Sequence, residues 1–296
     1  MAAIKKTRFD RIFDAVIYTL LGLLTFTYLY VLIYTVSASF SDPNDVYSGK
    51  VILFPVNFTL QGYERVFQEK MIWIGYKNSL IYMVIGTLVS SVLTLTSAYA
   101  LSRKDLIGRG IITGLLVFTM FFSGGIIPLY LIVRSLKLLD TMWALILPGA
   151  VSMSNVIIAR TFYANSIPAG LLDAAKIDGT NNIGFFFRIA LPLSKAIIAV
   201  IALYYAIGYW NDYFNAMIYL KTRTKYPLQL FLREILISSQ TSSAMTGDVL
   251  EQELLAQLQE IIKYTLIVVG SVPLLIIYPF VQKYFVQGVM IGSLKE

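Results

Sequence analysis

The side chains that most often make and break bonds in proteins are missing from this chain. Its 296 residues include no cysteine and no histidine, so it has no thiol nucleophile, no disulfide and neither of two common metal ligands. No compact pair of carboxylates falls inside its apolar segments. We therefore expect no catalytic residue, no metal site and no cofactor in this chain, and a hydrolase or metalloenzyme is disfavoured.

The most informative polar segment runs from Asp173 to Gly179 and reads Asp-Ala-Ala-Lys-Ile-Asp-Gly; nine residues further on follow Ile189-Ala-Leu-Pro192. It has the composition of a short surface helix, yet it lies between two long apolar segments. From composition alone, an ordinary amphipathic interfacial helix and a docking helix for a partner are both open.

Local residue types predict where this helix starts and stops. Pro168 suits the first turn, because the donor that proline lacks would be unsatisfied there anyway. Asp178-Gly179 predicts the stop, since glycine accepts the left-handed conformation that ends many helices. We expect one apolar face toward a partner, formed by Leu171, Leu172 and Ala175.

Long apolar segments make up most of the chain, which is 57% hydrophobic and 14% charged. A bilayer core needs roughly 20 apolar residues in a helix, and lipid forces the helix because backbone groups must be satisfied within the segment. We expect an all-α membrane protein with one domain, residues 1–296, and a loop at about 164–188 that carries the polar helix. The six expected spans are about 13–38, 78–101, 111–133, 142–163, 189–210 and 262–282.

Basic residues are distributed unequally over the two sides that these spans define. With the N-terminus in the cytoplasm, the inner segments hold 13 Lys/Arg and six acids, whereas the outer segments hold 11 of each. The whole formal charge of +7 therefore falls on one side, as the positive-inside rule predicts for the cytoplasmic face. These charges are spread over four short segments without a basic stripe, so nucleic acid is not an expected partner.

The polar segment resembles a known pattern. Permease subunits of bacterial ABC importers carry a cytoplasmic loop with Glu-Ala-Ala, then Gly, then Ile-x-Leu-Pro at fixed spacing, and Asp173 stands here where Glu is usual. Asp178 precedes the Gly as in the sugar-importer branch. The positions in register are Ala174, Ala175, Gly179, Ile189, Leu191 and Pro192.

The resemblance covers nearly the whole chain and points to the six-span subunit of maltose-type oligosaccharide importers. Its further motifs are Phe54–Leu60, Ala98–Arg103, Pro128–Tyr130, Trp210–Phe214 and Tyr278–Phe285. The ending Gln287–Lys295 is similar to a sub-branch that includes second permeases of alginate-oligosaccharide and similar polysaccharide-fragment importers.

The resemblance implies a type I ABC importer permease that moves an oligosaccharide across the bacterial cytoplasmic membrane by alternating access, with both termini in the cytoplasm. The implied partners are a second permease subunit in a heterodimer, two ABC ATPase subunits, an extracytoplasmic solute-binding protein and the lipid bilayer. The chain has no P-loop, since Gly49-Lys50 lacks the required spacing, so partner subunits would bind ATP and Mg²⁺. The residues implied to couple to the ATPase are Leu171, Leu172, Asp173, Ala174, Ala175, Asp178 and Gly179.

Polar and aromatic residues within or near the spans are candidates for the translocation path, because buried polar groups in membranes usually face a cavity or a partner. Amide, hydroxyl and aromatic groups also suit a sugar, although tyrosine and tryptophan gather in interfacial belts as well. The candidates are Ser152, Asn155, Tyr204, Trp210, Asn211 and Tyr213.

Two other classes of function remain as alternatives. An intramembrane enzyme would need catalytic groups that this chain lacks. An ion-coupled secondary carrier would need ionisable residues at mid-span, and the sequence places almost none there.

Overall fold

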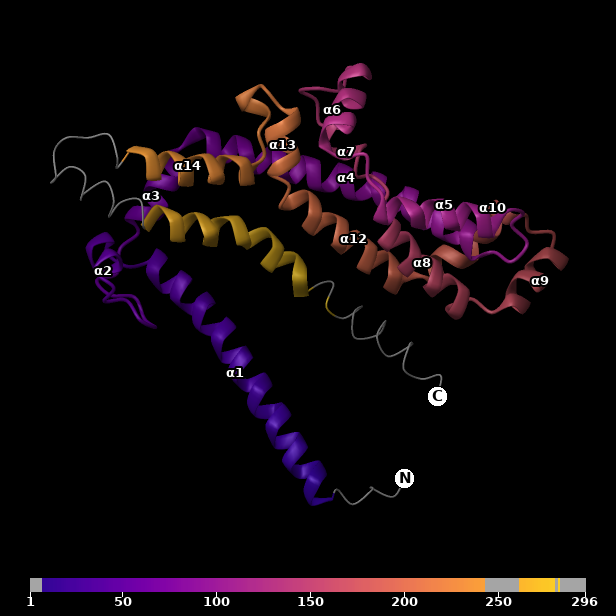
Figure 1. Cartoon of the computed structure of the whole chain (residues 1–296), viewed down its shortest axis with the longest axis horizontal. Coiled ribbons are helices and arrows are strands. Elements are labelled where there is room, and N and C mark those ends of the chain that lie inside the picture. Colours follow the sequence, from indigo (N-terminus) through magenta and orange to yellow (C-terminus); the bar gives the residue numbers. More distant parts are fainter. Residues whose placement is uncertain (1–6, 243–260, 280–281, 283–296) are drawn as a thin grey trace. The chain divides into compact units, whose positions relative to one another are not determined.

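A computed structural model describes residues 7–242, 261–279 and 282. Every regular element in these residues is a helix, as the all-α class predicts (Figure 1). The chain forms two compact units, which are described separately: residues 1–69 with 234–271, and residues 70–233 with 272–296. The motif Gln287–Lys295 lies outside the described residues.

The first unit is built around the apolar helix α1 (Arg8–Ser39). Thr7 caps it, since its Oγ1 accepts from the N–H of Asp10 while Asp10 accepts from the N–H of Thr7. In the most apolar stretch of α1 no residue is buried within this unit. The unit also contains α2 (Pro43–Tyr47), α3 (Gln61–Gln68) and the start of the helix Ile261–Pro279.

Three helices pack together in the second unit: α4 (Lys70–Ser102), α8 (Met153–Ser166) and α12 (Lys195–Trp210). Gly86 of α4 allows a close approach to α12, because a Cβ there would lie 2.7 Å from the ring of Tyr209. Small residues serve close packing of membrane helices in this way.

The expected span 111–133 is two helices in the structure, α5 (Arg109–Phe121) and α6 (Ile126–Ser135), with a bend of 113° between them. Gly125 stands at the break with φ of +82°, a backbone conformation that favours glycine. The segment is apolar on both sides of the break, so its composition does not predict that the helix is interrupted.

The expected spans 142–163 and 189–210 are also interrupted. The first consists of α7 (Trp143–Ile146) and α8, with Pro148 in the gap between them. The second begins with a π-helical turn before Pro192, a residue that cannot donate the usual helical hydrogen bond. The helices 182–193 and 195–210 meet at a bend of 83°.

Three helices in the described part of the chain are long and apolar enough to cross a membrane, and up to five segments qualify if each bent pair is one span. The last expected span, 262–282, is described as the helix Ile261–Pro279 and residue 282. The shorter elements are α9 (Ala169–Ile177), α10 (Asn182–Phe185), the π turn Phe186–Ala190, α11 (Leu191–Leu193), α13 (Phe214–Tyr219), the 3-10 turn η2 (Arg223–Lys225) and α14 (Leu228–Ser242). The boundary between the two units falls within α14, between residues 233 and 234.

Candidate functional site

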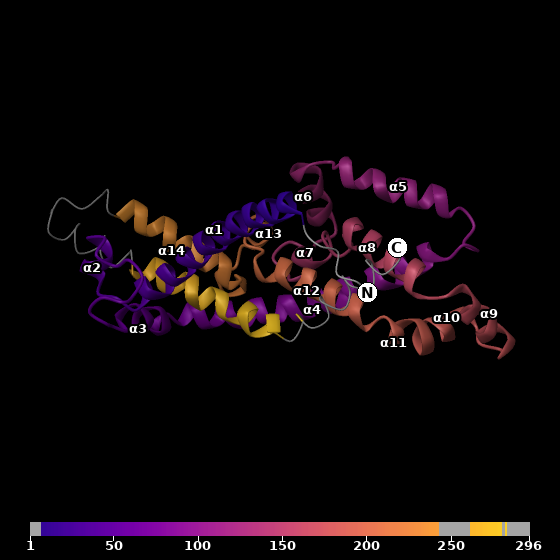
Figure 2. The same ribbon diagram turned by 90° about the horizontal axis from the view of Figure 1, so that it is seen from below.

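The polar segment forms a distinct short helix, α9, at the end of the second unit where α4 finishes (Figures 1 and 2). Pro168 precedes its first residue as the N-cap. At the other end Gly179 has φ of +76° and donates to the carbonyl of Lys176, while Thr180 donates to the carbonyl of Ala175. This is a Schellman stop, which confirms the helix end predicted from Asp178-Gly179.

The structure divides the expected partner-facing surface of α9. Ala175 is only 5% exposed, so its side chain packs inside the chain. The sequence-based expectation that Ala175 faces a partner is therefore wrong. Leu172 is half-buried, whereas Leu171, Asp173, Ala174, Asp178 and Gly179 are exposed. Ile177 is 87% exposed and was missed in the sequence, because the helix is too short for its period to define a face.

Arg103, at the end of α4, links the loop of α9 and α10 to the helical bundle. Its guanidinium donates to both carboxylate oxygens of Asp105, at 2.9 and 2.6 Å, and to the hydroxyl of Tyr99 at 3.1 Å. It also donates to Oδ1 of Asn182, in the first turn of α10, at 3.2 Å. The Arg103 hydrogen bonds lower the pKa of Asp105 to about 2, so this ion pair persists at neutral pH.

Two further arginines cap the carbonyl end of α4. Arg160 of α8 donates to the carbonyl of Leu101 at 3.0 Å, and Arg109 of α5 donates to the carbonyl of Arg103 at 3.4 Å. Helix ends leave such carbonyls without partners, and cations there also interact favourably with the helix dipole. The three arginines thus join α4, α5, α8 and α10 at one place.

A pocket of about 310 Å³ lies beside this junction and reaches α9. Its charged lining comprises Arg103, Lys104, Asp105, Asp173 and Lys176. Leu172 from α9 and Phe185 from α10 contribute apolar surface. On this side α9 is therefore not close-packed against the bundle.

A line of buried hydroxyl groups connects α4 with α12. The hydroxyl of Tyr209 lies 2.7 Å from Oγ of Ser90, and that of Tyr205 lies 2.6 Å from Oγ1 of Thr94. Tyr205 also accepts from the N–H of Ser152, at the N-terminus of α8, at 2.9 Å. Interhelical hydrogen bonds of this kind contribute about 0.6 kcal/mol each on average in a membrane.

The six candidates for the translocation path differ in exposure. Trp210 is 0% exposed, with its ring centroid 5.7 Å from that of Tyr76, and Asn155 is also buried. Ser152 is half-buried and uses its backbone in the hydroxyl line described above. The exposed candidates are Tyr204, Asn211 and Tyr213. Contact with a substrate stays a prediction for all six.

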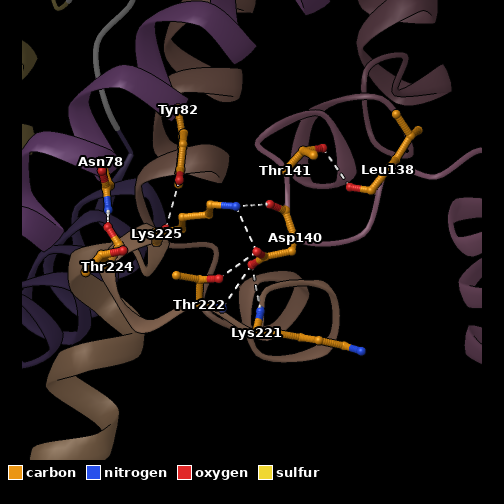
Figure 3. A network of polar contacts seen from close by, with 9 residues as sticks. All are labelled: Asn78, Tyr82, Leu138, Asp140, Thr141, Lys221, Thr222, Thr224 and Lys225. Carbon is orange, nitrogen blue, oxygen red and sulfur yellow. Dashed lines mark hydrogen bonds and ion pairs between the residues drawn. The ribbon is translucent and has the colours of Figure 1, made fainter.

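A second polar network lies in the same unit, around Asp140 (Figure 3). Its carboxylate accepts from the N–H groups of Lys221 and Thr222 at 3.0 and 2.9 Å, from the Thr222 hydroxyl at 2.6 Å and from Nζ of Lys225 at 2.7 Å. Burial would raise the pKa of Asp140, but the hydrogen bonds from Lys225 and Thr222 outweigh it and hold the pKa well below its usual range.

Helix α4 contacts the same segment from the other side. Nδ2 of Asn78 donates to the carbonyls of Thr224 and Tyr226 at 2.9 and 3.0 Å, and the hydroxyl of Tyr82 donates to the carbonyl of Lys225 at 2.8 Å. The segment 221–226 is therefore fixed between α4 and the loop that contains Asp140. The partners lie more than 80 residues apart in sequence, and no local pattern predicts them.

No protein-family model matches the chain, but individual proteins match nearly all of it. The polygalacturonan/rhamnogalacturonan transport system permease protein YtcP of Bacillus subtilis is 45% identical over 287 residues, which cover 97% of this chain and 99% of that protein. A chain in the crystal structure of a bacterial ABC transporter involved in the import of the acidic polysaccharide alginate is 35% identical. It superposes with a TM-score of 0.83 and covers 96% of this chain and 100% of that one. The chain belongs to the permease subunits of bacterial carbohydrate ABC importers.

A second relative, the protein LplC of Bacillus subtilis, is 40% identical over 289 residues, covering 98% of this permease and 97% of LplC. The family and fold that we expected from the loop pattern and the apolar segments are thus confirmed. The permease is a multi-pass membrane protein of a carbohydrate import system, and these similarities give no support to an ion-coupled carrier or an intramembrane enzyme. Permeases of this family work with partners such as an ATPase and a binding protein.

Proposed function

We propose that this permease imports oligosaccharides that carry carboxylate groups, such as fragments of polygalacturonan. The observation that carries the proposal is the 45% identity, over 97% of the chain, with a permease named for polygalacturonan and rhamnogalacturonan transport. The similarity to a chain of an importer for the acidic polysaccharide alginate supports the same class of cargo. Uronate sugars are ionised at neutral pH, so a cationic group on the path would help to recognise them.

Arg233 is suited to that role. Its Cζ lies 4.9 Å from the ring centre of Tyr213, one of the exposed path candidates, and its side chain is partly exposed. A guanidinium recognises a carboxylate with two parallel hydrogen bonds, while an aromatic ring offers a face for a sugar. We place Arg233 on the path beside Tyr213, together with the other five candidates.

The experiment measures uptake by the complete transporter in proteoliposomes, with its binding protein, for trigalacturonate and for maltotriose as a neutral sugar of equal length. We expect uptake of trigalacturonate in preference to maltotriose. Arg233→Gln should lower kcat/KM for trigalacturonate about tenfold, which corresponds to about 1.4 kcal/mol of lost recognition.

Arg233→Lys is the matched control, since it keeps the charge but lacks the planar guanidinium. Its kcat/KM for trigalacturonate should fall less than that of Arg233→Gln. Preferential uptake of maltotriose by the unmodified transporter would contradict the acidic cargo. An unchanged kcat/KM in Arg233→Gln would remove Arg233 from the path and leave the cargo proposal standing.

The proposed assembly comprises this permease, a second and different permease chain, two ATPase subunits that bind ATP and Mg²⁺, and an extracytoplasmic binding protein. Helix α9 would dock on an ATPase subunit through its exposed residues. The half-buried Leu172 and the inward-facing Ala175 would instead hold α9 on the bundle. Both chain termini would lie in the cytoplasm, as the distribution of basic residues favours.

A further inference from the structure

The pocket beside Arg103 lies at the level where two of the expected spans end. One wall is formed by Ser102–Asp105, which directly follow the expected span 78–101. Another is formed by residues of the segment 164–168, which directly follows the expected span 142–163. The headgroup layer of a bilayer begins where its hydrocarbon core ends. We therefore expect the pocket at the depth of lipid headgroups, on the cytoplasmic side in the orientation proposed above.

Two cations in the lining of this pocket are not used by the protein itself. Lys104 and Lys176 are exposed, and the ammonium group of neither makes a hydrogen bond or an ion pair with another described residue at contact distance. By contrast, Arg103 and Asp105 neutralise each other in the ion pair described above. The charges that remain in the lining are the two lysines and Asp173, which together give a net charge of +1.

The lining also contains a buried hydroxyl group that lacks a partner. Tyr163 is 2% exposed, and its hydroxyl has no hydrogen-bond partner at bonding distance among the described residues. A buried polar group without a partner is costly, so its presence in a pocket points to a ligand that would accept or donate there. Leu172 and Phe185 add apolar surface to the same pocket.

We infer that this pocket binds the headgroup of an anionic phospholipid with free hydroxyl groups, such as phosphatidylglycerol. Its phosphodiester carries one negative charge, which matches the net charge of +1 in the lining, and lysine is a common ligand of phosphate. The glycerol hydroxyls can donate to Asp173, and the apolar wall suits the glycerol backbone and the start of the acyl chains. Basic pockets at the cytoplasmic ends of membrane helices bind acidic headgroups in this way.

A bound headgroup would contact three elements at once: the end of α4, the end of α8 and α9. It would fill the space that separates α9 from the bundle on this side. Inorganic phosphate offers the same charged group, but it would leave Asp173 and the apolar wall without partners. The inference does not depend on which sugar the permease imports.

The test uses the complete transporter, purified in detergent and depleted of lipid. Its Tm is measured against the concentration of added phosphatidylglycerol, phosphatidylcholine or inorganic phosphate, because a ligand of the folded state raises the Tm by mass action. Phosphatidylglycerol should raise the Tm in a saturable way, whereas the other two should not. Lys104→Gln, which lies outside α9, should raise the half-saturating concentration of phosphatidylglycerol about fivefold. This corresponds to about 1 kcal/mol for one basic residue at an anionic headgroup.

The double variant Lys104→Gln/Lys176→Gln should raise the half-saturating concentration at least tenfold. Lys195→Gln is the matched control, since it removes an exposed lysine of the expected inner side that does not line the pocket. It should bind phosphatidylglycerol like the unmodified permease, as should Lys104→Arg, which keeps the charge. If the double variant does not assemble, Lys104→Gln alone decides.

An unchanged half-saturating concentration in the glutamine variants overturns the inference, and so does equal stabilisation by phosphatidylcholine. A rise in Tm with inorganic phosphate that is lost in Lys104→Gln would assign the pocket to a free anion and overturn the assignment to a lipid.

Discussion

Asp140 is the residue whose removal should most clearly loosen the packing of the segment 221–226 in the second unit. Its carboxylate accepts four hydrogen bonds from the segment 221–225, one of them from the ammonium of Lys225. Asp140→Asn keeps the shape and removes the charge. Because the pair is partly exposed and therefore screened, we expect a loss of about 1 kcal/mol. Thermal unfolding of the purified permease should show a Tm lower by about 2–4 °C.

The pH dependence follows from the direction of the pKa shift. The pKa of the Asp140 carboxyl is lower in the folded protein than in the unfolded chain, where it is about 3.9. The ionised carboxylate therefore stabilises the fold at pH values above about 3.9. This stabilisation is lost as the pH falls toward the pKa of Asp140 in the folded protein. The Tm difference between the permease and Asp140→Asn should therefore be constant from about pH 8 to 5 and narrow below about pH 4. Glu64→Gln, which removes an exposed acid on α3, is the control for the general effect on the Tm of removing a carboxylate. A Tm difference between the permease and Asp140→Asn that grows as the pH falls would contradict a lowered pKa for Asp140.

At the scale of elements, α9 is where the proposed docking on the ATPase can be tested. Asp173 is exposed on α9 and lines the pocket beside Arg103, so Asp173→Lys reverses a charge without filling a core position. We expect the complete transporter to hydrolyse ATP while its uptake of sugar falls at least tenfold. Both rates are measured in the same proteoliposomes.

Glu64→Lys makes the same change of charge on α3, far from α9 in the sequence, and should leave both rates close to those of the unmodified permease. Normal uptake by Asp173→Lys would remove Asp173 from the coupling contact. A parallel loss of uptake in both variants would indicate a general effect of charge on the assembly.

The sequence predicted those elements whose signals are local. Gly179 marks the end of α9 because only a short-range backbone requirement is involved. The break at Gly125 escaped prediction because apolar composition identifies a membrane segment without showing whether its helix is continuous. The inward position of Ala175 and the bond from Arg103 to Asn182, 79 residues away, depend on tertiary packing that no single-sequence pattern encodes.

At the scale of the whole molecule, charge distribution is the main physical argument for orientation. The inner segments carry the entire net charge of +7, but the expected outer segments 70–77, 134–141 and 211–233 of the second unit also hold eight Lys/Arg and two acids. The short loop 102–110 holds three of the 13 inner cations, and short loops weigh most in setting topology.

The orientation can be tested directly, because the chain has no native cysteine. Single cysteines are placed at three exposed positions: Phe54, 78% exposed, Ile107, 94% exposed, and Ile177, 87% exposed. In intact cells a membrane-impermeant maleimide should label Phe54→Cys. Ile107→Cys and Ile177→Cys should react only after the membrane is permeabilised, and the cysteine-free permease should not react at all. Labelling of Ile177→Cys in intact cells would place α9 outside, where no ATPase could reach it, and would overturn both the orientation and the proposed coupling contact.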